Sequence, residues 1–480
     1  MPVPPEADPL AHAVATADPF AAAAASELRD AAARAVLDVI AASFTVAADP
    51  SARTDRDRLL AWAHAEGEPT DPRSVIGAGT GLAPARAALV GGFQAHLLDL
   101  DDTHESVRGH PSAVLVPTLL ALAEPTDPVD ALLAAYTVGL EVMARLGTVL
   151  GPDHYLAGWH PTGSVGVVAA AAAGAHLRRL DPVATGTALS VAASRSGGVR
   201  AQFGTPGKPL HAGIAAQSGV EAVQWAMTGL RTAPSAVLGD HGLLAAHGVD
   251  PARRSAITAD FGRRWALLDP GLWFKRYPFC SAAMSAADAA TEIAGRLGPG
   301  PGPAGPSGAP VDIREVVVRV RPGADAALIH SAPRTGEQAR FSLEAIVALI
   351  LSGRRPSLEN LAHVPLDPEV TVLAARVRRE HVPAPTSGGR RDFWAQVEVR
   401  RSGDRSLVAE VQRPLGSPEN PLPAAALHDK LVEATGDPDR AEAIRVALDP
   451  TVGPAPTILQ RLTALLPAAP TTPRRKEPRR

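Results

Sequence analysis

The sequence predicts a mainly α protein that consists of a large all-helical domain and a smaller α+β lid domain. A chain of 480 residues is too long for one simple core, so two domains are expected. Apolar residues recur at helical spacing through the first half, and no alternating β pattern occurs before about residue 310. A segment rich in proline and glycine at 297–310 then leads to the β-branched run IREVVVRV at 313–320.

The helical domain is predicted to span residues 23–271, after a flexible N-terminal arm at 1–22 that is rich in alanine and proline. Its first helix is expected to begin at Ser26, a typical N-cap residue. Asp127 and Asp181 each precede a proline, the pattern of a capping carboxylate before proline at the first helical position. Buried helices with few charged residues are expected at 128–149, 161–180, 182–194 and 211–229.

The α+β lid domain is predicted to span residues 272–415. After the strand at 313–320, helices are expected at 338–352 and 367–375, and strands at 392–400 and 405–412. A Ser-Gly-Asp sequence at 402–404 predicts a hairpin turn between the last two strands.

Helical pattern returns after this domain, and the C-terminal helices at 416–468 are expected to rejoin the helical domain. Three segments carry that pattern, at 422–435, 438–447 and 456–466. The tail at 469–480 is basic and rich in proline, and we interpret it as a solvated end.

The composition excludes several classes of protein. Hydrophobic residues make up 46% and charged residues 20%, as in globular proteins. The net charge of -3, without a basic stripe in the body, argues against nucleic acid as a partner. A single cysteine excludes an internal disulfide and fits the reducing cytoplasm. The N-terminus lacks signal-peptide order, and no unbroken apolar run reaches membrane-spanning length, so no membrane partner is expected.

The stretch HLLDLDDTHESVRGHPSAVLVP, residues 96–117, is the first candidate for an active-site wall. Within fifteen residues it holds three histidines and four acidic residues: His96, His104, His110, Asp99, Asp101, Asp102 and Glu105. Alanine-rich helical sequence flanks the stretch on both sides, and a buried helical core has little structural need for so many ionisable groups. On a helix, His96, Asp99 and Thr103 would share one face. We assign function to Asp99 and His110, since a carboxylate beside an imidazole sets its pKa. We interpret Asp101 and Glu105 as helix-capping residues.

Three later patches carry further candidates, and each holds a charged or titratable side chain next to proline. In GWHPTGS, His160 opens a buried helix whose N-terminus suits a substrate carboxylate. In GTPGKPLHAG, Lys208 and His211 open another helix, but the spacing is not that of a phosphate-binding loop. KRYPFC, at 275–280, lies at the seam of the two domains, where ligand sites are common.

Two alternative chemistries stay open but are less favoured. HESVRGH is not the HExxH zinc motif, so a His/Asp metal site is the minority interpretation and no metal is predicted. Cys280 could serve as a nucleophile, yet a single cysteine is more often a small buried hydrophobic residue.

Together these patches resemble the signatures of the MmgE/PrpD family, which includes 2-methylcitrate dehydratase, cis-aconitate decarboxylase and iminodisuccinate epimerase. ALVGGFQAHLLDLDDTHESVRGHPSAVLVPTLLALAE is similar to its first signature. Later signatures are matched, in the same order, by GWHPTGSVG, SRSGGVRAQFGTPGKPLHAGIAAQSGV, KRYPFC and GSPENPL. The resemblance extends from about residue 25 to residue 470.

The resemblance implies a homodimer that acts on small di- or tricarboxylates without a cofactor. Such reactions remove a proton or a carboxylate next to another carboxylate. Dehydration is the expected reaction, and epimerisation and decarboxylation are the alternatives. The implied catalytic residues are His110, His160, Lys208 and Asp99. The implied or neighbouring substrate-binding residues are Thr103, Lys275, Tyr277, Cys280 and His211.

Three positions depart from the family pattern, and at a fourth, Cys280, the chain resembles decarboxylase members less, because these carry histidine there. Gly91 stands where the family has asparagine, and Met284 follows Cys280 where dehydratase-like members have histidine. Ala345 replaces a tyrosine that is often found in the helix after ARFSL. These changes affect the lid side, so the substrate is expected to differ from citrate-type acids or one acid–base role to be lost. The alternative is a repurposed member that binds or transforms a larger metabolite.

Overall fold

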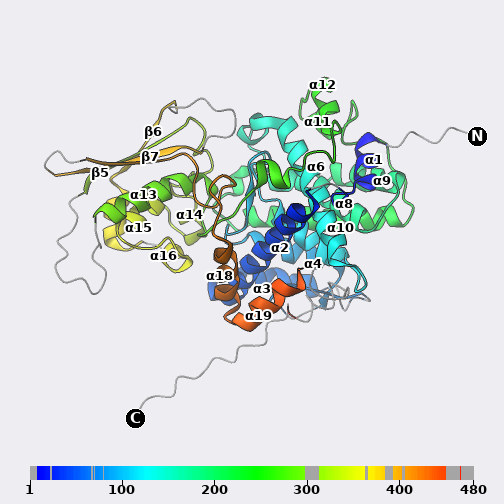
Figure 1. Ribbon diagram of the computed structural model, residues 1–480, viewed down its shortest axis with the longest axis horizontal. Coiled ribbons are helices and arrows are strands. Elements are labelled where there is room, and N and C mark those ends of the chain that lie inside the picture. The colour runs from blue at the N-terminus through cyan, green and yellow to red at the C-terminus, as the bar shows by residue number, and fades with distance from the viewer. Residues whose placement is uncertain are drawn as a thin grey trace, which may run out of the picture.

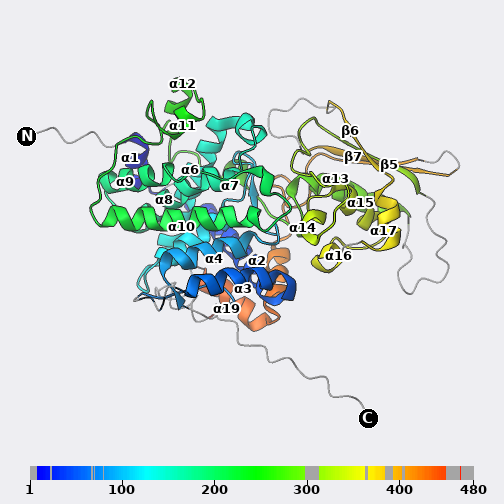
Figure 2. The same ribbon diagram turned by 180° about the vertical axis from the view of Figure 1, so that it is seen from behind.

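The computed structural model describes residues 8–21, 24–65, 67, 69, 71–78, 81–297, 313–362, 366–383, 393–402, 406–449 and 465. Figures 1 and 2 show a large helical part beside a smaller part that contains a sheet, which confirms the predicted fold class. The helical part contains α1 (Pro9–Thr16), α2 (Ala25–Ala48), α3 (Pro50–His64), α4 (Pro84–His96), α5 (Ser112–Leu122), α6 (Val129–Leu156), α7 (Pro161–Ser164), α8 (Gly166–Leu177), α9 (Pro182–Ala193), α10 (Gly207–Met227), α11 (Leu243–Ala246) and α12 (Pro251–Arg254).

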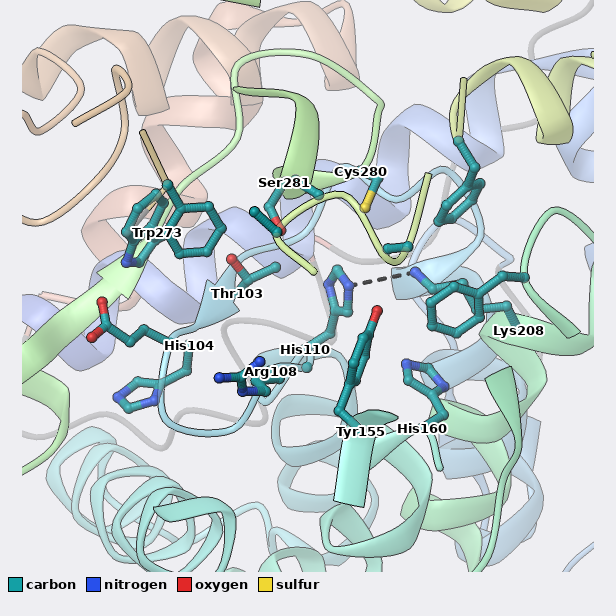
Figure 3. A pocket seen from close by; sticks show the side chains of 18 of the residues that line it. Thr103, His104, Arg108, His110, Tyr155, His160, Lys208, Trp273, Cys280 and Ser281 are labelled. Carbon is teal, nitrogen blue, oxygen red and sulfur yellow. Dashed lines mark hydrogen bonds between the residues drawn. The ribbon is translucent and has the colours of Figure 1, made fainter. Parts of the chain in front are cut away.

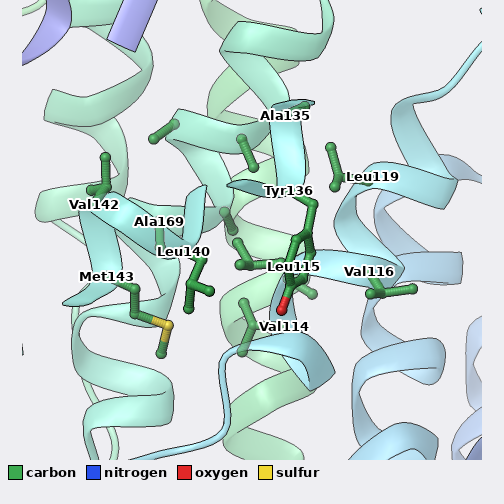
Figure 4. Close-up of a cluster of buried hydrophobic side chains, with 14 of the residues drawn as sticks. Val114, Leu115, Val116, Leu119, Ala135, Tyr136, Leu140, Val142, Met143 and Ala169 are labelled. Atoms are coloured by element: carbon green, nitrogen blue, oxygen red, sulfur yellow. The ribbon is translucent and has the colours of Figure 1, made fainter. Parts of the chain in front are cut away.

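Helix α8 lies at the centre of the helical part, in contact with α5, α6, α9 and α10. Its sequence GVVAAAAAGAHL is almost entirely small and apolar, and every residue except His176 is buried. Small side chains let neighbouring backbones approach closely, so one helix can be covered on all sides. Around α5 and α6 the core contains larger side chains, and the hydroxyl group of Tyr136 reaches Ser112 Oγ at 2.6 Å (Figure 4).

The smaller part is a four-stranded sheet with helices packed against it. The strand order is β6–β5–β7–β8, with β5 (Ile313–Val320) parallel to β6 (Val377–His381) and antiparallel to β7 (Ala395–Arg401), which pairs with β8 (Ser406–Val411). Helix α13 (Met284–Leu297) contacts β7, β8 and α15 (Leu343–Leu351). The remaining helices of this part are α14 (Gly336–Ala339), α16 (Leu358–Ala362) and α17 (Pro368–Ala374).

The chain then returns to the helical part. Helix α18 (Ala424–Thr435) packs against α2, and α19 (Pro438–Ala447) packs against α18. In the described part of the chain, four short strands outside the sheet form two pairs, β1 (Arg73–Ser74) with β2 (Gly81–Leu82) and β3 (Thr103–His104) with β4 (Leu272–Trp273). The second pair joins segments far apart in sequence, beside the candidate site.

Several local predictions are wrong in detail. Residues 1–22 are not an arm throughout, because Pro9–Thr16 forms α1, which Asp8 caps and which packs against α8 and α9. Helix α1 has only 8 residues, about two turns, which is too short for a helical periodicity to be recognised in the sequence. Ser26 lies inside α2, and Asp127 accepts a hydrogen bond from the Glu124 N–H instead of capping α6, whereas Asp181 caps α9 as predicted.

The lid-side predictions also need correction. The helix expected at 338–352 is divided into α14 and α15, and strand β6 was not predicted because its sequence VRREH is mostly charged. The linker 298–312, most of the turn at 402–404, the helix at 456–466 and the tail 469–480 lie outside the described residues, apart from residue 465. The predicted domain boundaries stay predictions.

Two helices, α2 and α6, are long and apolar enough to cross a membrane by length and composition alone. Most of the apolar window is buried inside the structure in both, 61% in α2 and 83% in α6. Burial against other helices accounts for their apolar character, as in the core helices of globular proteins.

A substitution at Gly147 tests how closely α6 packs against the loop that precedes α5. A Cβ there would lie 2.8 Å from Val107 Cα and closer still to the Ser106 carbonyl oxygen. We expect Gly147→Ala to lower the free energy of unfolding by about 1–3 kcal/mol through overpacking, despite the better helix propensity of alanine. Urea unfolding measures the change. Gly186→Ala in α9 is the control, since its Cβ meets only Ala11 Cβ at 3.6 Å; equal stability of the two variants would contradict this close contact.

Candidate active site

A pocket lies between the helical part and the smaller part and encloses about 610 Å³, including space open to solvent (Figure 3). The helical part supplies titratable side chains, and the smaller part mainly supplies apolar walls. The principal lining residues are Thr103, His104, Glu105, Arg108, His110, Tyr155, His160, Phe203, Lys208, Trp273, Cys280, Ser281, Phe341 and Phe393.

The chain between α4 and β3 does not continue the helix, which corrects the predicted helical face. Helix α4 ends at His96, and Asp99 has a left-handed φ of 53°, which an α-helix does not tolerate. Thr103 lies in β3, paired with Trp273 of β4. The helical spacing of His96, Asp99 and Thr103 is therefore accidental, although all three lie in or beside the site.

Asp99 is buried between two lysine ammonium groups. Lys208 Nζ donates to Asp99 Oδ1, and Lys275 Nζ donates to Asp99 Oδ2 at 2.9 Å and to the Asp99 carbonyl oxygen at 2.8 Å. Burial alone would raise the pKa of Asp99, but Lys208 and Lys275 more than offset it and hold that pKa below its ordinary value. Two cations facing one carboxylate leave a net positive charge for an anionic substrate.

His110 lies beside this group, with a second carboxylate behind it. Its Nε2 is 3.4 Å from Lys208 Nζ and 3.5 Å from Asp99 Oδ1, and its Nδ1 is 3.1 Å from Asp101 Oδ2. Burial, with the neighbouring His96 ring, lowers the pKa of His110 to about 3. A proton on Nδ1 would face Asp101 and leave the Nε2 lone pair beside Lys208. His110 is therefore a neutral imidazole at neutral pH, able to accept a proton.

Asp101 is not a helix-capping residue, since its carboxylate lies against two imidazoles; both Asp101 and Asp102 are fully buried. Asp101 bonds His96 Nδ1 at 3.0 Å, so it orients one imidazole and lies against another, His110. Asp102 accepts a hydrogen bond of 2.5 Å from Ser112 Oγ. Burial and the nearby Asp38 raise the pKa of Asp102 well above its ordinary value. The capping interpretation of Asp101 is wrong, because long-range packing covers the whole turn.

His160 precedes α7 on another side of the pocket. Its Nδ1 lies 3.0 Å from His211 Nδ1, and its ring stacks on the His96 ring with centroids 6.0 Å apart. Burial, together with Lys208 and the other imidazoles, lowers the pKa of His160 well below its ordinary value. The site thus holds a second neutral imidazole. His211 contacts His160 but does not line the pocket.

The four remaining candidates divide between two places. Thr103 and Cys280 line the pocket, and burial raises the pKa of Cys280, so its thiol is a weak nucleophile. Lys275 reaches the site only through Asp99. Tyr277 lies elsewhere: with Met284, it lines a second cavity of about 860 Å³ on the far side of Lys275.

The structure adds lining residues that the sequence analysis missed. Tyr155 lies five residues before His160 at the end of α6, and its side chain extends into the pocket (Figure 3). Arg108 lies within residues 96–117, but in a chain with many arginines nothing in the sequence marked it as a site residue. Phe203 and Trp273 supply apolar walls. No periodicity marks these residues, since they converge through the packing of distant segments.

Four potential metal ligands lie together, in His96, Asp99, Asp101 and His110, whose ligand atoms all lie within 4.8 Å of one another. Both Asp99 oxygens already face lysine ammonium groups. A divalent cation coordinated by Asp99 would have to displace these ammonium groups, so the donor set fits a metal poorly. The absence of a metal cofactor stays a prediction.

The scaffold and pocket define a mainly helical protein with a buried imidazole–carboxylate–ammonium site, of the kind that performs acid–base chemistry on anions. The chain belongs to the MmgE/PrpD family. The model of the MmgE/PrpD N-terminal domain matches residues 10–253, and that of the C-terminal domain matches residues 277–448. The resemblance seen in the sequence is thus confirmed.

Several relatives are cis-aconitate decarboxylases. The human enzyme is 34% identical over 218 residues, which cover 44% of this chain and 45% of that protein. The mouse enzyme is 36% identical over 156 residues, 31% of this chain and 32% of that protein. An enzyme of Aspergillus terreus is 24% identical over 421 residues, 83% of each chain. The chain thus matches less than half the length of the human and mouse relatives.

His104 is another buried imidazole, and the pH dependence of the protein's stability tests whether burial lowers its pKa. Its Nε2 lies 3.1 Å from the Ala266 carbonyl oxygen, and burial lowers its pKa from 6.5 to about 4. Between these values the unfolded chain binds the extra proton, so the folded state loses stability as the pH falls. His104→Gln should flatten this dependence by up to about 1.4 kcal/mol per pH unit.

Urea unfolding at several pH values across this window measures that slope. His12→Gln, which replaces an exposed histidine, is the control and should leave the slope unchanged. An unchanged slope in the His104 variant would show that His104 titrates in the folded protein much as in the unfolded one.

Proposed function

We propose that the protein is a cofactor-independent lyase that acts on a small di- or tricarboxylate. The observation that carries the proposal is a neutral imidazole, His110, beside the buried Lys208–Asp99–Lys275 group. A base and a fixed positive charge at one place suit a reaction that develops negative charge next to a carboxylate. Family membership supports the same class of chemistry.

In the proposed mechanism, Lys208 binds the substrate carboxylate that receives the developing charge. An ammonium group has three N–H donors. Lys208 uses one of them on Asp99 and directs a second at His110 Nε2, so the third can bind a substrate oxygen. Lys275 spends two donors on Asp99, is 1% exposed and acts by fixing that carboxylate. Thr103 supplies a further hydroxyl donor at the pocket wall.

His110 and His160 perform the proton transfers in this mechanism. Both are neutral before substrate binds, so either can accept a proton from substrate carbon and return it in a later step. The loss of a proton or of carbon dioxide leaves an electron pair that the neighbouring carboxylate delocalises beside Lys208. In dehydration, the imidazole that accepted the substrate proton then donates a proton to the departing hydroxyl group. In decarboxylation no substrate proton is removed, so an imidazole takes up a proton from water and delivers it to the carbon that lost carbon dioxide.

Three reaction types are candidates. The sequence motifs led to dehydration, whereas the names of the relatives favour decarboxylation of a tricarboxylate such as cis-aconitate. Epimerisation would need the second imidazole to return the proton to the opposite face. A repurposed member would bind such an acid without converting it.

Loss of either imidazole tests the mechanism. We expect His110→Ala and His160→Ala each to lower turnover at least ~100-fold, the low end for the loss of an acid–base group. NMR in deuterated water with citrate, 2-methylcitrate, cis-aconitate and iminodisuccinate measures turnover and proton exchange for the wild type and each variant. The products distinguish dehydration, decarboxylation and epimerisation.

Exposed His241→Ala is the control and should retain the wild-type rate. Unchanged rates in both imidazole variants would refute this mechanism. Binding without exchange or conversion by the wild type would support the repurposed alternative.

We also propose that the protein is a homodimer, as the family resemblance implies, and that it is cytoplasmic, since a single cysteine fits a reducing compartment. Helix α10 carries two large exposed apolar residues eleven positions apart, Ile214 (44%) and Trp225 (43%), which therefore lie on one face. Light scattering should give twice the mass of one chain, and Ile214→Glu with Trp225→Glu should give a monomer. Val372→Glu, at another exposed apolar residue, is the control. A monomeric wild type would contradict the proposal.

A further inference from the structure

We propose that Arg108 binds a second carboxylate of the substrate at the outer part of the pocket, and that it selects tricarboxylates over dicarboxylates. This assignment rests on the proposed function, because it assumes that the pocket binds a small polycarboxylate. It goes further in that it assigns a role in substrate choice to a residue outside the catalytic group.

The charge of the pocket is the first argument. Lys208 and Lys275 carry two positive charges, of which Asp99 neutralises one. The ionised Asp101 behind His110 offsets the other. His110 and His160 are neutral, so this inner group has a net charge of about zero. A fully ionised tricarboxylate carries about three negative charges at neutral pH, since carboxyl groups titrate near pH 4. A further cation is therefore required for tight binding.

Arg108 is placed to supply that cation. It lines the same pocket as Thr103, His110, Tyr155 and Lys208 (Figure 3). Its guanidinium group stays charged in the folded protein, and the planar fork of donors suits a carboxylate. Arg108 comes from the loop between β3 and α5, so its position is independent of the Asp99 group.

The side chain of Arg108 interacts electrostatically with Tyr155, Glu105 and Asp153. It is half-buried, yet it makes no hydrogen bond and no ion pair within 4.0 Å with any residue that the structure describes. Arg200, by contrast, donates to the carbonyl oxygens of Tyr155 and Ala326, and buried Arg340 donates to that of Leu97. A half-buried guanidinium group whose N–H donors are not taken up by carbonyl oxygens in this way can donate them to an anion.

The backbone holds Arg108 in an unfavourable conformation, which is the second, independent observation. Its φ is 55°, a left-handed value that is costly for a residue with a long side chain. The Arg108 N–H donates to the His104 carbonyl oxygen at 2.9 Å, and the His104 N–H donates to that of Gly109 at 3.1 Å. A Cβ on Gly109 would lie 2.8 Å from Thr162 Oγ1, so close contact with α7 fixes this turn.

Binding of two non-reactive acids tests the assignment. Tricarballylate and glutarate share a three-carbon backbone and differ by the central carboxylate. Calorimetry should show that the wild type binds tricarballylate more tightly than glutarate. Arg108→Gln should weaken tricarballylate binding roughly ten- to hundredfold, the range for a hydrogen bond to a charged group, and leave glutarate binding nearly unchanged. Arg108→Lys should retain part of the preference.

Arg179→Gln is the matched control, because Arg179 is an exposed arginine with a similar left-handed φ of 52°. It should leave the affinity for both acids unchanged, and thermal unfolding checks that each variant is folded. Equal weakening of both acids by Arg108→Gln, no weakening of either, or no preference in the wild type would overturn the role of Arg108 alone. If the wild type binds neither acid, the proposed function fails as well.

Discussion

The candidate site depends on one buried carboxylate, Asp99, held between the ammonium groups of Lys208 and Lys275. The three residues come from the turn after α4, the first turn of α10 and the segment after β4, so their contact joins both parts of the molecule. Removing charges from water is costly, and an unpaired partner would cost about 3–5 kcal/mol. The arrangement is thus a constraint on the fold as much as a feature of the chemistry.

The C-terminal helices take part in this constraint. Lys430 of α18 donates to Asp38 Oδ1 at 2.6 Å and to the Leu100 carbonyl oxygen at 2.8 Å, and it reaches that of Lys275 at 3.4 Å. It therefore supports both backbone segments that carry the Asp99 group. Because the chain returns to α2 after the sheet, helix α18 can fix the positions of the backbone segments that carry Asp99 and Lys275 relative to each other.

Burial also decides the protonation of the site. Burial, together with the neighbouring imidazoles and lysines, lowers the pKa of His110 and of His160, so both imidazoles are neutral at neutral pH. Asp99 stays ionised because its lysine partners outweigh the effect of burial. A neutral base beside a fixed positive charge is the combination that proton abstraction next to a carboxylate requires. Arg108 extends the positive charge toward the outer part of the pocket.

The sequence by itself determined the fold class and the family, because helical periodicity and ordered motifs are local. It also singled out Asp99, His110 and Lys208, whose neighbouring prolines and charges are unusual in helical sequence. Only the tertiary structure decided which of them meet. It showed that Asp101 belongs with the imidazoles and that Tyr277 lines another cavity. These outcomes depend on contacts between residues far apart in the chain, and long-range packing, which sets them, leaves no local pattern.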